Sequence, residues 1–182
     1  LSGGLRVPRV LAQDIEQGFL LLEDLGRETY LHVLNDDTAD ALFEVALAAL
    51  VKLQAIPVPD GFPEYDDPSL LRELRLFDEW FLGVHLGVKL DDGERERLFQ
   101  VYRLLIDAAL AQPQVLVHRD YMPRNLMPCG GDVAILDFQD AVRGPVAYDP
   151  ACLFKDAFLS WPEERVSGWH ARYHALATGA GI

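Results

Sequence analysis

The chain has 182 residues, half of them hydrophobic and a quarter charged, which is the balance of a globular protein and suits one sizeable domain or part of a two-lobed one. Its 16 basic and 29 acidic residues give a formal net charge of −13. This charge argues against nucleic acid as a partner, because duplex binding depends on basic side chains that neutralise phosphates. No apolar stretch approaches the ~18 residues that a membrane span requires, so no membrane partner is expected.

The two cysteines, Cys129 and Cys152, are too few for a disulfide framework and lack the spacing of metal ligands. They fit a reducing compartment, and we expect a cytoplasmic protein. The chain begins at Leu1 and not at a methionine. We therefore also expect that an N-terminal portion is missing from it.

An N-terminal hairpin is predicted from two segments, residues 7–12 and 19–26, with a turn at Gln17-Gly18 between them. The second segment is apolar enough to be buried. Because two strands alone are only marginally stable in water, we expect the hairpin to belong to a sheet whose other strands lie outside this chain.

Three helices are predicted after the hairpin. The first begins near Asp37-Thr38 and ends before Pro57, with apolar residues at helical spacing between them. The second opens at Asp67-Pro68, a cap followed by a first-turn proline, and the third opens at Asp91-Asp92-Gly93.

Several apolar and aromatic side chains recur at helical spacing in this part of the chain and beyond it. The third helix carries on one side Leu98, Val101, Leu104, Leu105 and Ala108. Four aromatic residues could line a ligand pocket, but such residues are more often part of a core, and we expect them there: Trp80, Phe81, Trp161 and Trp169.

Short strands joined by turns follow the third helix, at residues 115–118, 125–127 and 133–138. Two more helices are predicted over residues 150–158 and 163–177. The whole pattern predicts an α+β fold, in which a mainly helical lobe carries a small β insert and a hairpin forms its N-terminal edge.

The segment His118-Arg119-Asp120, followed by four residues and Asn125, matches the catalytic-loop pattern of protein kinases, H-R-D-x-x-x-x-N. Asp137-Phe138 ends an apolar strand 12 residues after Asn125, where the kinase D-F-G would lie. A single aspartate at a strand end is usually a turn former. The joint occurrence of these elements in the expected order favours a phosphotransferase over coincidence.

Phosphoryl transfer explains why these residue types recur together. Transfer from ATP needs Mg²⁺ to neutralise the phosphate oxygens, and hard oxygen ligands hold that ion. We therefore predict Asp137 and Asn125 as Mg²⁺ ligands, with ATP as the phosphoryl donor. Asp120 is the predicted catalytic base, which accepts the proton of the attacking hydroxyl and orients it.

Three departures from the protein-kinase pattern indicate a kinase for small molecules. Gln139 replaces the glycine of D-F-G, so the switch of regulated protein kinases is not indicated. Tyr148-Asp149-Pro150 begins a helix about 12 residues after Asp137, which leaves no room for a long activation segment. No G-x-G-x-x-G loop and no strand lysine are present, so we expect the phosphate-clamping lobe to be missing from the chain.

The segments HRDYMPRN, LDFQD and GPVAYDPACL resemble the aminoglycoside phosphotransferase and choline kinase-like superfamily. Within it, the chain looks most like the bacterial sugar kinases that phosphorylate the anomeric hydroxyl of N-acetylmuramate and N-acetylglucosamine in cell-wall recycling. The resemblance implies an amino sugar of the cell wall as acceptor, with Asp120, Asn125 and Asp137 in the roles given above.

The resemblance also implies a protein-kinase-like fold. Residues 1–26 would be the end of the N-terminal lobe, a hairpin remnant with the hinge, and residues 27–182 the helical C-terminal lobe. Glu23 and Leu25 would belong to the hinge, where the carbonyl of the first and the N–H of the second would meet adenine.

Other residues beside the reactive cluster have less specific expected roles. His118 is expected to pack and hydrogen-bond beneath the loop, Arg119 to form a structural ion pair, and Asp149 to cap the helix that starts at Pro150. Three more side chains could contact a sugar or support the residues that do, and both interpretations stay open: Arg124, Gln139 and Asp140.

Three alternatives remain at the level of the sequence. A kinase for an aminoglycoside or a choline-like amine is mildly favoured by the net charge of −13. A non-catalytic nucleotide-binding protein would account for the absent lysine, but not for three intact reactive side chains. A metal-dependent hydrolase would need further His or Asp ligands for a two-metal site.

Overall fold

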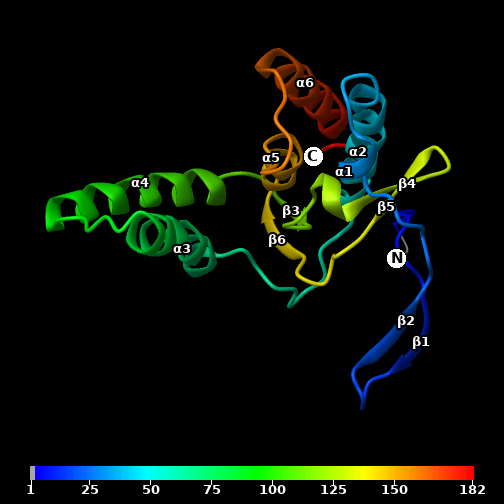
Figure 1. Cartoon of the computed structure of the whole chain (residues 1–182), viewed down its shortest axis with the longest axis horizontal. Helices are drawn as coiled ribbons and strands as arrows, with labels where there is room; N and C mark the ends of the chain where they lie inside the picture. The colour runs from blue at the N-terminus through cyan, green and yellow to red at the C-terminus, as the bar shows by residue number, and fades with distance from the viewer. Residues whose placement is uncertain (1–2) are drawn as a thin grey trace.

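The computed structural model describes residues 3–182. Figure 1 shows a body of helices and short strands, from which two parts project in different directions. One is the N-terminal hairpin of β1 and β2, and the other is an arm formed by α3, its continuation, and α4.

The elements follow the predicted order, with one short helix, one short strand and a π-helical stretch that the sequence did not predict. In chain order they are β1 (Val10–Asp14), β2 (Phe19–Leu22), α1 (Tyr30–Val33), α2 (Ala39–Gln54), α3 (Asp67–Leu76), the π-helix η1 (Phe77–His85), α4 (Asp92–Leu110), β3 (Gln114–Val117), the 3₁₀ turn η2 (Pro123–Asn125), β4 (Leu126–Cys129), β5 (Asp132–Ile135), β6 (Val142–Pro145), α5 (Tyr148–Phe154) and α6 (Glu163–Gly179). The predicted α+β fold with a mainly helical lobe is confirmed.

The strands within residues 3–182 form three separate antiparallel pairs, β1 with β2, β3 with β6, and β4 with β5. The β4–β5 hairpin turns at Gly130 and Gly131, whose φ angles are +58° and +89°. Glycine adopts such angles without a steric penalty, so a tight turn is possible here. This hairpin and the β3–β6 pair carry the segments on which the predicted reactive residues lie.

The main core lies between α2 and α6 and extends beneath α5. Phe43 of α2 packs its edge on Trp169 of α6, with ring centroids 4.5 Å apart, and also contacts Phe154 of α5. The hydroxyl of Tyr173 donates to the buried side-chain oxygen of Gln54 at 2.6 Å. Trp169 is therefore in the core, as predicted.

A second, smaller core joins the arm to the β3–β6 pair. It consists of Tyr65, Leu70, Ile106, Val115, Val117 and Val142. Both arm helices are capped by aspartate, Asp91 for α4 and Asp66 for α3. The prediction that Asp67 caps α3 is wrong by one residue, because the carboxylate of Asp66 reaches the N–H of Ser69 at 3.0 Å and Asp67 is already helical.

The outer part of the arm exposes apolar side chains. Trp80 is 62 % exposed and Leu104 of α4 is 68 % exposed. The prediction that Trp80 and Phe81 lie in a core is wrong for the described residues. The side chains that α4 buries are Tyr102 and Ile106, and both Trp80 and Phe81 are left exposed to solvent.

The β1–β2 hairpin is also exposed along its length. The expected burial of residues 19–22 is not provided by residues 3–182, since the hairpin is bonded to the body only near its base. There the N–H of Ile135 in β5 donates to the carbonyl of Arg6 at 2.9 Å. The N–H of Glu23 donates to the carbonyl of Arg9 at 2.9 Å and so closes the base of the hairpin itself.

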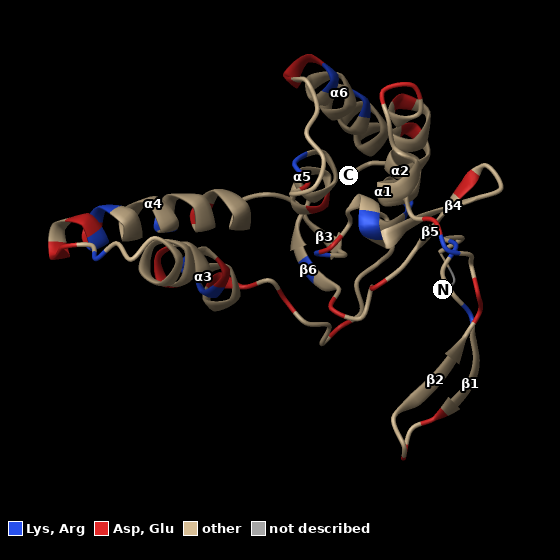
Figure 2. Ribbon diagram, viewed as in Figure 1, with Lys and Arg blue, Asp and Glu red and all other residues tan. Residues whose placement is uncertain are grey.

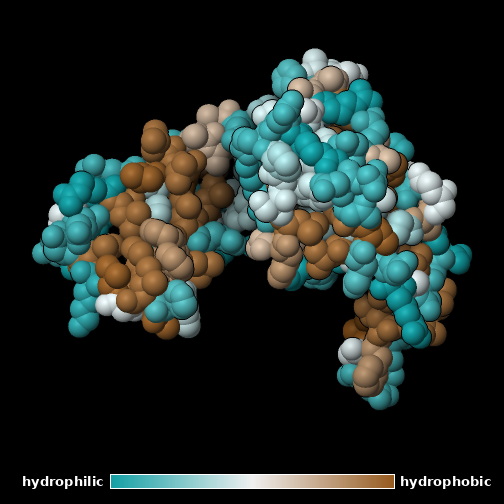
Figure 3. All heavy atoms as spheres, turned by 45° about the horizontal axis from the view of Figure 1, so that its top comes forward, coloured by the Kyte–Doolittle hydropathy of each residue, from teal (hydrophilic) through white to brown (hydrophobic). Residues whose placement is uncertain are grey.

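Charge and hydropathy are distributed differently over this architecture. The acidic residues are scattered over the arm, the body and the hairpin, so the negative charge is not gathered on one face (Figure 2). Apolar surface is concentrated on the arm and on the hairpin (Figure 3). Within residues 3–182, no helix combines the length and apolar character that crossing a membrane would take.

Candidate active site

The loop between β3 and β4 holds the predicted base. Asp120 is half-buried, and its backbone carbonyl accepts hydrogen bonds from the N–H of Met122 at 2.9 Å and from the side-chain amide of Asn125 at 3.0 Å. Its own backbone N–H donates to Nδ1 of His118 at 3.3 Å. The loop is thus closed on itself around Asp120, and this closure restricts the backbone that carries the carboxylate.

The two predicted metal ligands flank the open end of the β4–β5 hairpin: Asn125 directly precedes β4, and Asp137 follows the end of β5 by two residues. Leu126 pairs with Ile135 in the register, and the N–H of Leu136 donates to the carbonyl of Asn125 at 2.9 Å. Asp137, the next residue, is therefore held beside Asn125 although 12 positions separate the two in the sequence. Asp137 has a φ of +63°, a left-handed conformation that aspartate tolerates better than most residues.

The side chain of His118 hydrogen-bonds both to the loop of Asp120 and to the segment that leads to Asp137. It is buried, and because Nδ1 accepts the N–H of Asp120, Nε2 carries the proton and donates to the carbonyl of Leu136 at 2.9 Å. Burial lowers the pKa of His118, which agrees with a neutral ring. One imidazole thus bonds the loop of Asp120 to the residue that precedes Asp137.

Asp149 supports the same loop in a way that the sequence did not predict. It is fully buried within α5, and its carboxylate accepts the N–H of His118 at 2.8 Å and that of Arg119 at 3.0 Å. Burial raises its pKa to about 7. The expectation that Asp149 caps the helix at Pro150 is wrong, because Tyr148 already begins that helix and the carboxylate is used by backbone 30 residues earlier.

Arg119 has a φ of +76°, and the bonds of Asp149 to the backbone at this point help to hold that conformation. Its guanidinium forms an ion pair with Glu73 of α3 at 2.5 Å and lies over the ring of Tyr65. The ion pair expected for Arg119 is therefore present. Its partner was not identified, since nothing local in the sequence links residue 73 to residue 119.

Gln139 follows Asp137 on an exposed turn. Its side-chain amide donates to Oδ1 of Asp137 at 3.0 Å and approaches Oδ2 of Asp140 at 3.5 Å. Gln139 and Asp140 are therefore neighbours of the predicted metal ligand. Arg124 is exposed on η2, and its guanidinium lies 4.3 Å from the ring centroid of Phe158.

The donor set of this cluster fits Mg²⁺. Because Nδ2 of Asn125 is committed to a backbone carbonyl, its Oδ1 is the atom left for a cation, alongside the exposed carboxylate of Asp137. Among residues 3–182, no three or more His, Cys, Asp or Glu side chains are grouped to hold a metal by themselves. A site with one carboxylate, one amide and phosphate oxygens is the kind that Mg²⁺ occupies in phosphoryl-transfer enzymes.

The predicted hinge lies at the base of the β1–β2 hairpin. The carboxylate of Glu23 is bonded to Arg6 at 2.7 Å and to Arg9 at 3.2 Å, and these bonds, that of Arg6 first, lower its pKa. Within the described part of the chain, neither the carbonyl of Glu23 nor the N–H of Leu25 has a hydrogen-bond partner. Both groups are therefore open to a ligand.

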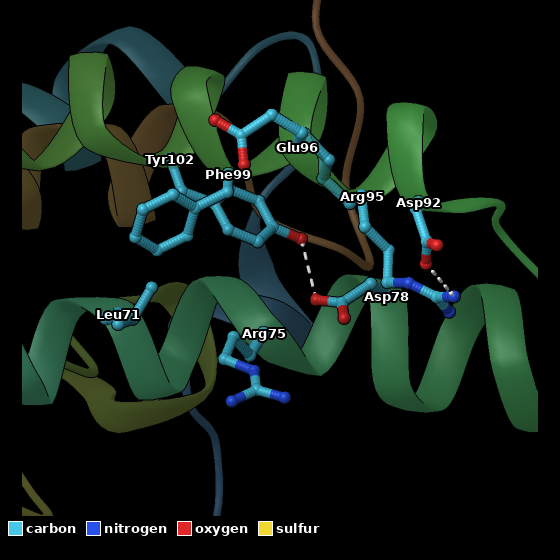
Figure 4. A pocket seen from close by; sticks show the side chains of 9 residues that line it. Leu71, Arg75, Asp78, Asp92, Arg95, Glu96, Phe99 and Tyr102 are labelled. Carbon is cyan, nitrogen blue, oxygen red and sulfur yellow. Dashed lines mark hydrogen bonds and ion pairs between the residues drawn. The ribbon is translucent and has the colours of Figure 1, made fainter.

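The cavity between the arm helices is separate from this cluster. It has a volume of about 320 Å³ and is lined mainly by Leu71, Arg75, Asp78, Arg95, Phe99 and Tyr102. In it the hydroxyl of Tyr102 donates to Asp78 at 2.9 Å, as Figure 4 shows. No residue of the 118–140 cluster lines it, so the polar groups with the relevant chemistry lie outside this cavity.

Comparison with known sequences gives a family and a set of relatives. The model of the phosphotransferase enzyme family matches residues 2–181. An N-acetylmuramate/N-acetylglucosamine kinase of Pseudomonas putida is 55 % identical over 181 residues, which cover 100 % of this chain and 53 % of that protein. One of Neisseria meningitidis is 41 % identical over 182 residues, with 98 % and 54 % covered. The chain thus spans about half the length of the curated relatives it matches.

Solved structures agree in fold at low sequence identity. An aminoglycoside phosphotransferase from Streptomyces rimosus, in complex with ADP and streptomycin, matches with a TM-score of 0.69 at 16 % identity, covering 97 % of this chain and 70 % of that one. An ethanolamine kinase of Plasmodium vivax matches with a TM-score of 0.63 at 17 % identity, covering 96 % and 53 %. These matches show the fold alone.

Proposed function

The chain belongs to the phosphotransferase enzyme family, and from this premise we propose that it forms the hinge and the catalytic lobe of an ATP-dependent kinase for a hydroxyl group of a small molecule. Residues 1–26 would complete an N-terminal lobe and residues 27–182 would form the lobe that carries the reactive groups. The observation that carries the proposal is the network in which His118 bonds both Asp120 and Leu136, the neighbour of Asp137.

Each reactive side chain has one role in this proposal. Asp120 accepts the proton of the attacking hydroxyl and orients its oxygen toward the γ-phosphorus. Asn125 and Asp137 hold Mg²⁺, which supplies charge neutralisation at the phosphate oxygens. Transfer is in line, without a covalent enzyme intermediate, and positioning by the rigid hairpin supplies much of the rate enhancement.

The hinge binds the adenine of ATP. The carbonyl of Glu23 accepts the exocyclic amine, and the N–H of Leu25 donates to a ring nitrogen. The ion pairs of Glu23 with Arg6 and Arg9 fix its backbone. The carbonyl of Arg6 accepts the N–H of Ile135 in β5. The hinge that binds adenine is therefore attached to the hairpin that carries both metal ligands.

The acceptor is N-acetylmuramate or N-acetylglucosamine, phosphorylated at the anomeric hydroxyl in cell-wall recycling. Identity of 55 % to kinases of that name supports this choice. The net charge of −13 favours an amine acceptor instead, but it is scattered over the whole chain (Figure 2), so it is weak support for a cationic ligand. The two free cysteines fit a cytoplasmic enzyme.

The test is an acceptor panel with the full-length protein that carries this chain. With Mg-ATP, we expect phosphate transfer to both amino sugars and none to kanamycin, choline or ethanolamine. Transfer to one of the amines and to neither sugar would make the amine-alcohol kinase the correct assignment. Binding of Mg-ATP without transfer to any acceptor would identify a non-catalytic nucleotide-binding protein.

A further inference from the structure

We propose that Arg124 and the ring of Phe158 form a carboxylate-binding subsite, which recognises the acid substituent of an anionic sugar acceptor. The inference rests on the proposed kinase function and adds to it a determinant of acceptor specificity. It identifies the group by which the enzyme distinguishes an acidic amino sugar from a neutral one.

The position of Arg124 in the loop is the first observation. Arg124 lies in η2, four residues after Asp120, and its neighbours Pro123 and Asn125 are both buried. The backbone of the turn is bonded at Asn125, whose N–H donates to the carbonyl of Met122 at 2.9 Å. A fixed backbone thus presents an exposed guanidinium in the same short segment as the predicted base.

The pairing of the surrounding cations is the second observation. Arg119 is neutralised by Glu73 at 2.5 Å, and Lys155, at the end of α5, by Glu163 at 2.7 Å. Across residues 3–182, no carboxylate lies within ion-pair distance of Arg124. Its guanidinium contacts the ring of Phe158, which leaves its positive charge available to a ligand.

Phe158 is the third observation. It lies in the connection between α5 and α6, where its backbone N–H donates to Asp156 at 2.7 Å, and its side chain is 56 % exposed. A ring this exposed contributes little to the core, but it can hold a guanidinium at 4.3 Å. When a guanidinium stacks on a ring, its N–H edges stay free for hydrogen bonds in the plane, which is the geometry that binds a carboxylate through two parallel bonds.

The negative charge of the reactive segments is the reason why an unpaired Arg124 would favour an anionic acceptor. Besides the predicted metal ligand Asp137, two carboxylates lie in the reactive segments, those of Asp120 and Asp140, and both would repel an anionic acceptor. A neutral acceptor would not need an unpaired arginine in the same loop as Asp120. N-acetylmuramate differs from N-acetylglucosamine by a lactyl ether that ends in a carboxylate, so the subsite would bind the first sugar and leave the second unaffected.

Steady-state kinetics on the full-length enzyme test the proposal. We expect Arg124→Gln to lower kcat/KM for N-acetylmuramate about 10- to 100-fold through a higher KM, because a charge-assisted bidentate contact is lost. For N-acetylglucosamine, kcat/KM should stay within about twofold, and Arg124→Lys should recover part of the loss. Phe158→Leu should give a smaller loss with the same selectivity.

An acceptor with the lactyl group converted to its methyl ester completes the test. For the wild type, replacing the acid by the ester should lower kcat/KM by the same factor as Arg124→Gln lowers it for the acid, and the variant should use ester and acid equally well. Equal losses for both sugars would overturn the proposal in favour of a contact with ATP, and unchanged kinetics would overturn it outright. If the wild type phosphorylates neither sugar, the proposed function itself fails, and the inference fails with it.

Discussion

Replacement of Asp149 by asparagine should change stability in a way that depends on pH. The fully buried carboxylate accepts the N–H groups of His118 and Arg119 at 2.8 and 3.0 Å. Burial raises its pKa from 3.8 to about 7, against the lowering effect of these two bonds. Asparagine has nearly the same shape and keeps one acceptor oxygen, but it does not titrate. Comparison of the two proteins therefore isolates the effect of the proton.

The sign of the effect follows from proton linkage. The folded protein holds the proton of Asp149 more tightly than the unfolded chain does, so the stability from this group is complete below about pH 4 and is lost as the pH rises through about 7. Each pH unit in that interval is worth about 1.4 kcal/mol. The free energy of unfolding of the wild type, minus that of Asp149→Asn, should therefore fall by up to about 4 kcal/mol between about pH 4 and pH 8.

Urea unfolding of both full-length proteins at a series of pH values measures this difference, with Asp60→Asn as a control at an exposed aspartate. The control should follow the wild type at every pH. A difference for Asp149→Asn that is constant, or that grows with pH, would refute the reasoning. It would mean that the carboxylate is ionised throughout and that its two hydrogen bonds outweigh burial.

Three further substitutions, the first with a matched control, test the β4–β5 turn, the core and the predicted metal site. Gly131→Ala should cost about 1 kcal/mol in urea unfolding, because Gly131 has a φ of +89°; Gly168→Ala, in α6 with open space around it, should be neutral or stabilising. Tyr121→Phe should cost about 1 kcal/mol by removing the buried bond to the carbonyl of Ala46 at 2.7 Å, and a cost near zero would contradict this. Asn125→Ala should raise the Mg²⁺ concentration for half-maximal transfer by roughly tenfold or more, and an unchanged requirement would exclude Asn125 as a ligand.

The local elements could be predicted from the sequence because their signals are local. The helix from Ala39 to Gln54 has an apolar face within one window of the chain, and the β4–β5 turn has its two glycines side by side. The candidate site was also accessible, since Asp120 and Asn125 are near neighbours and Asp137 follows the next strand. The pattern did not indicate the register in which Leu136 pairs with Asn125.

The parts that were missed depend on contacts between distant segments. A buried Asp149 that bonds the backbone of residues 118 and 119 looks, in the sequence, like an ordinary helix cap. The ion pair of Arg119 with Glu73 spans 46 positions. Periodicity identified apolar side chains such as Trp80, but it cannot tell what covers them, and residues 3–182 leave Trp80 exposed.

Phosphate transfer by an Asp120→Asn variant tests most directly the central claim that the 118–137 cluster is a kinase active site. Full-length wild type, Asp120→Asn and the control Asp60→Asn would be given Mg-ATP and N-acetylmuramate, with the product followed by ³¹P NMR. We predict that the control forms the anomeric phosphate at the wild-type rate. Asp120→Asn should bind Mg-ATP as tightly as the wild type but transfer phosphate about 10²- to 10⁴-fold more slowly. Transfer by Asp120→Asn at the wild-type rate would contradict the assignment.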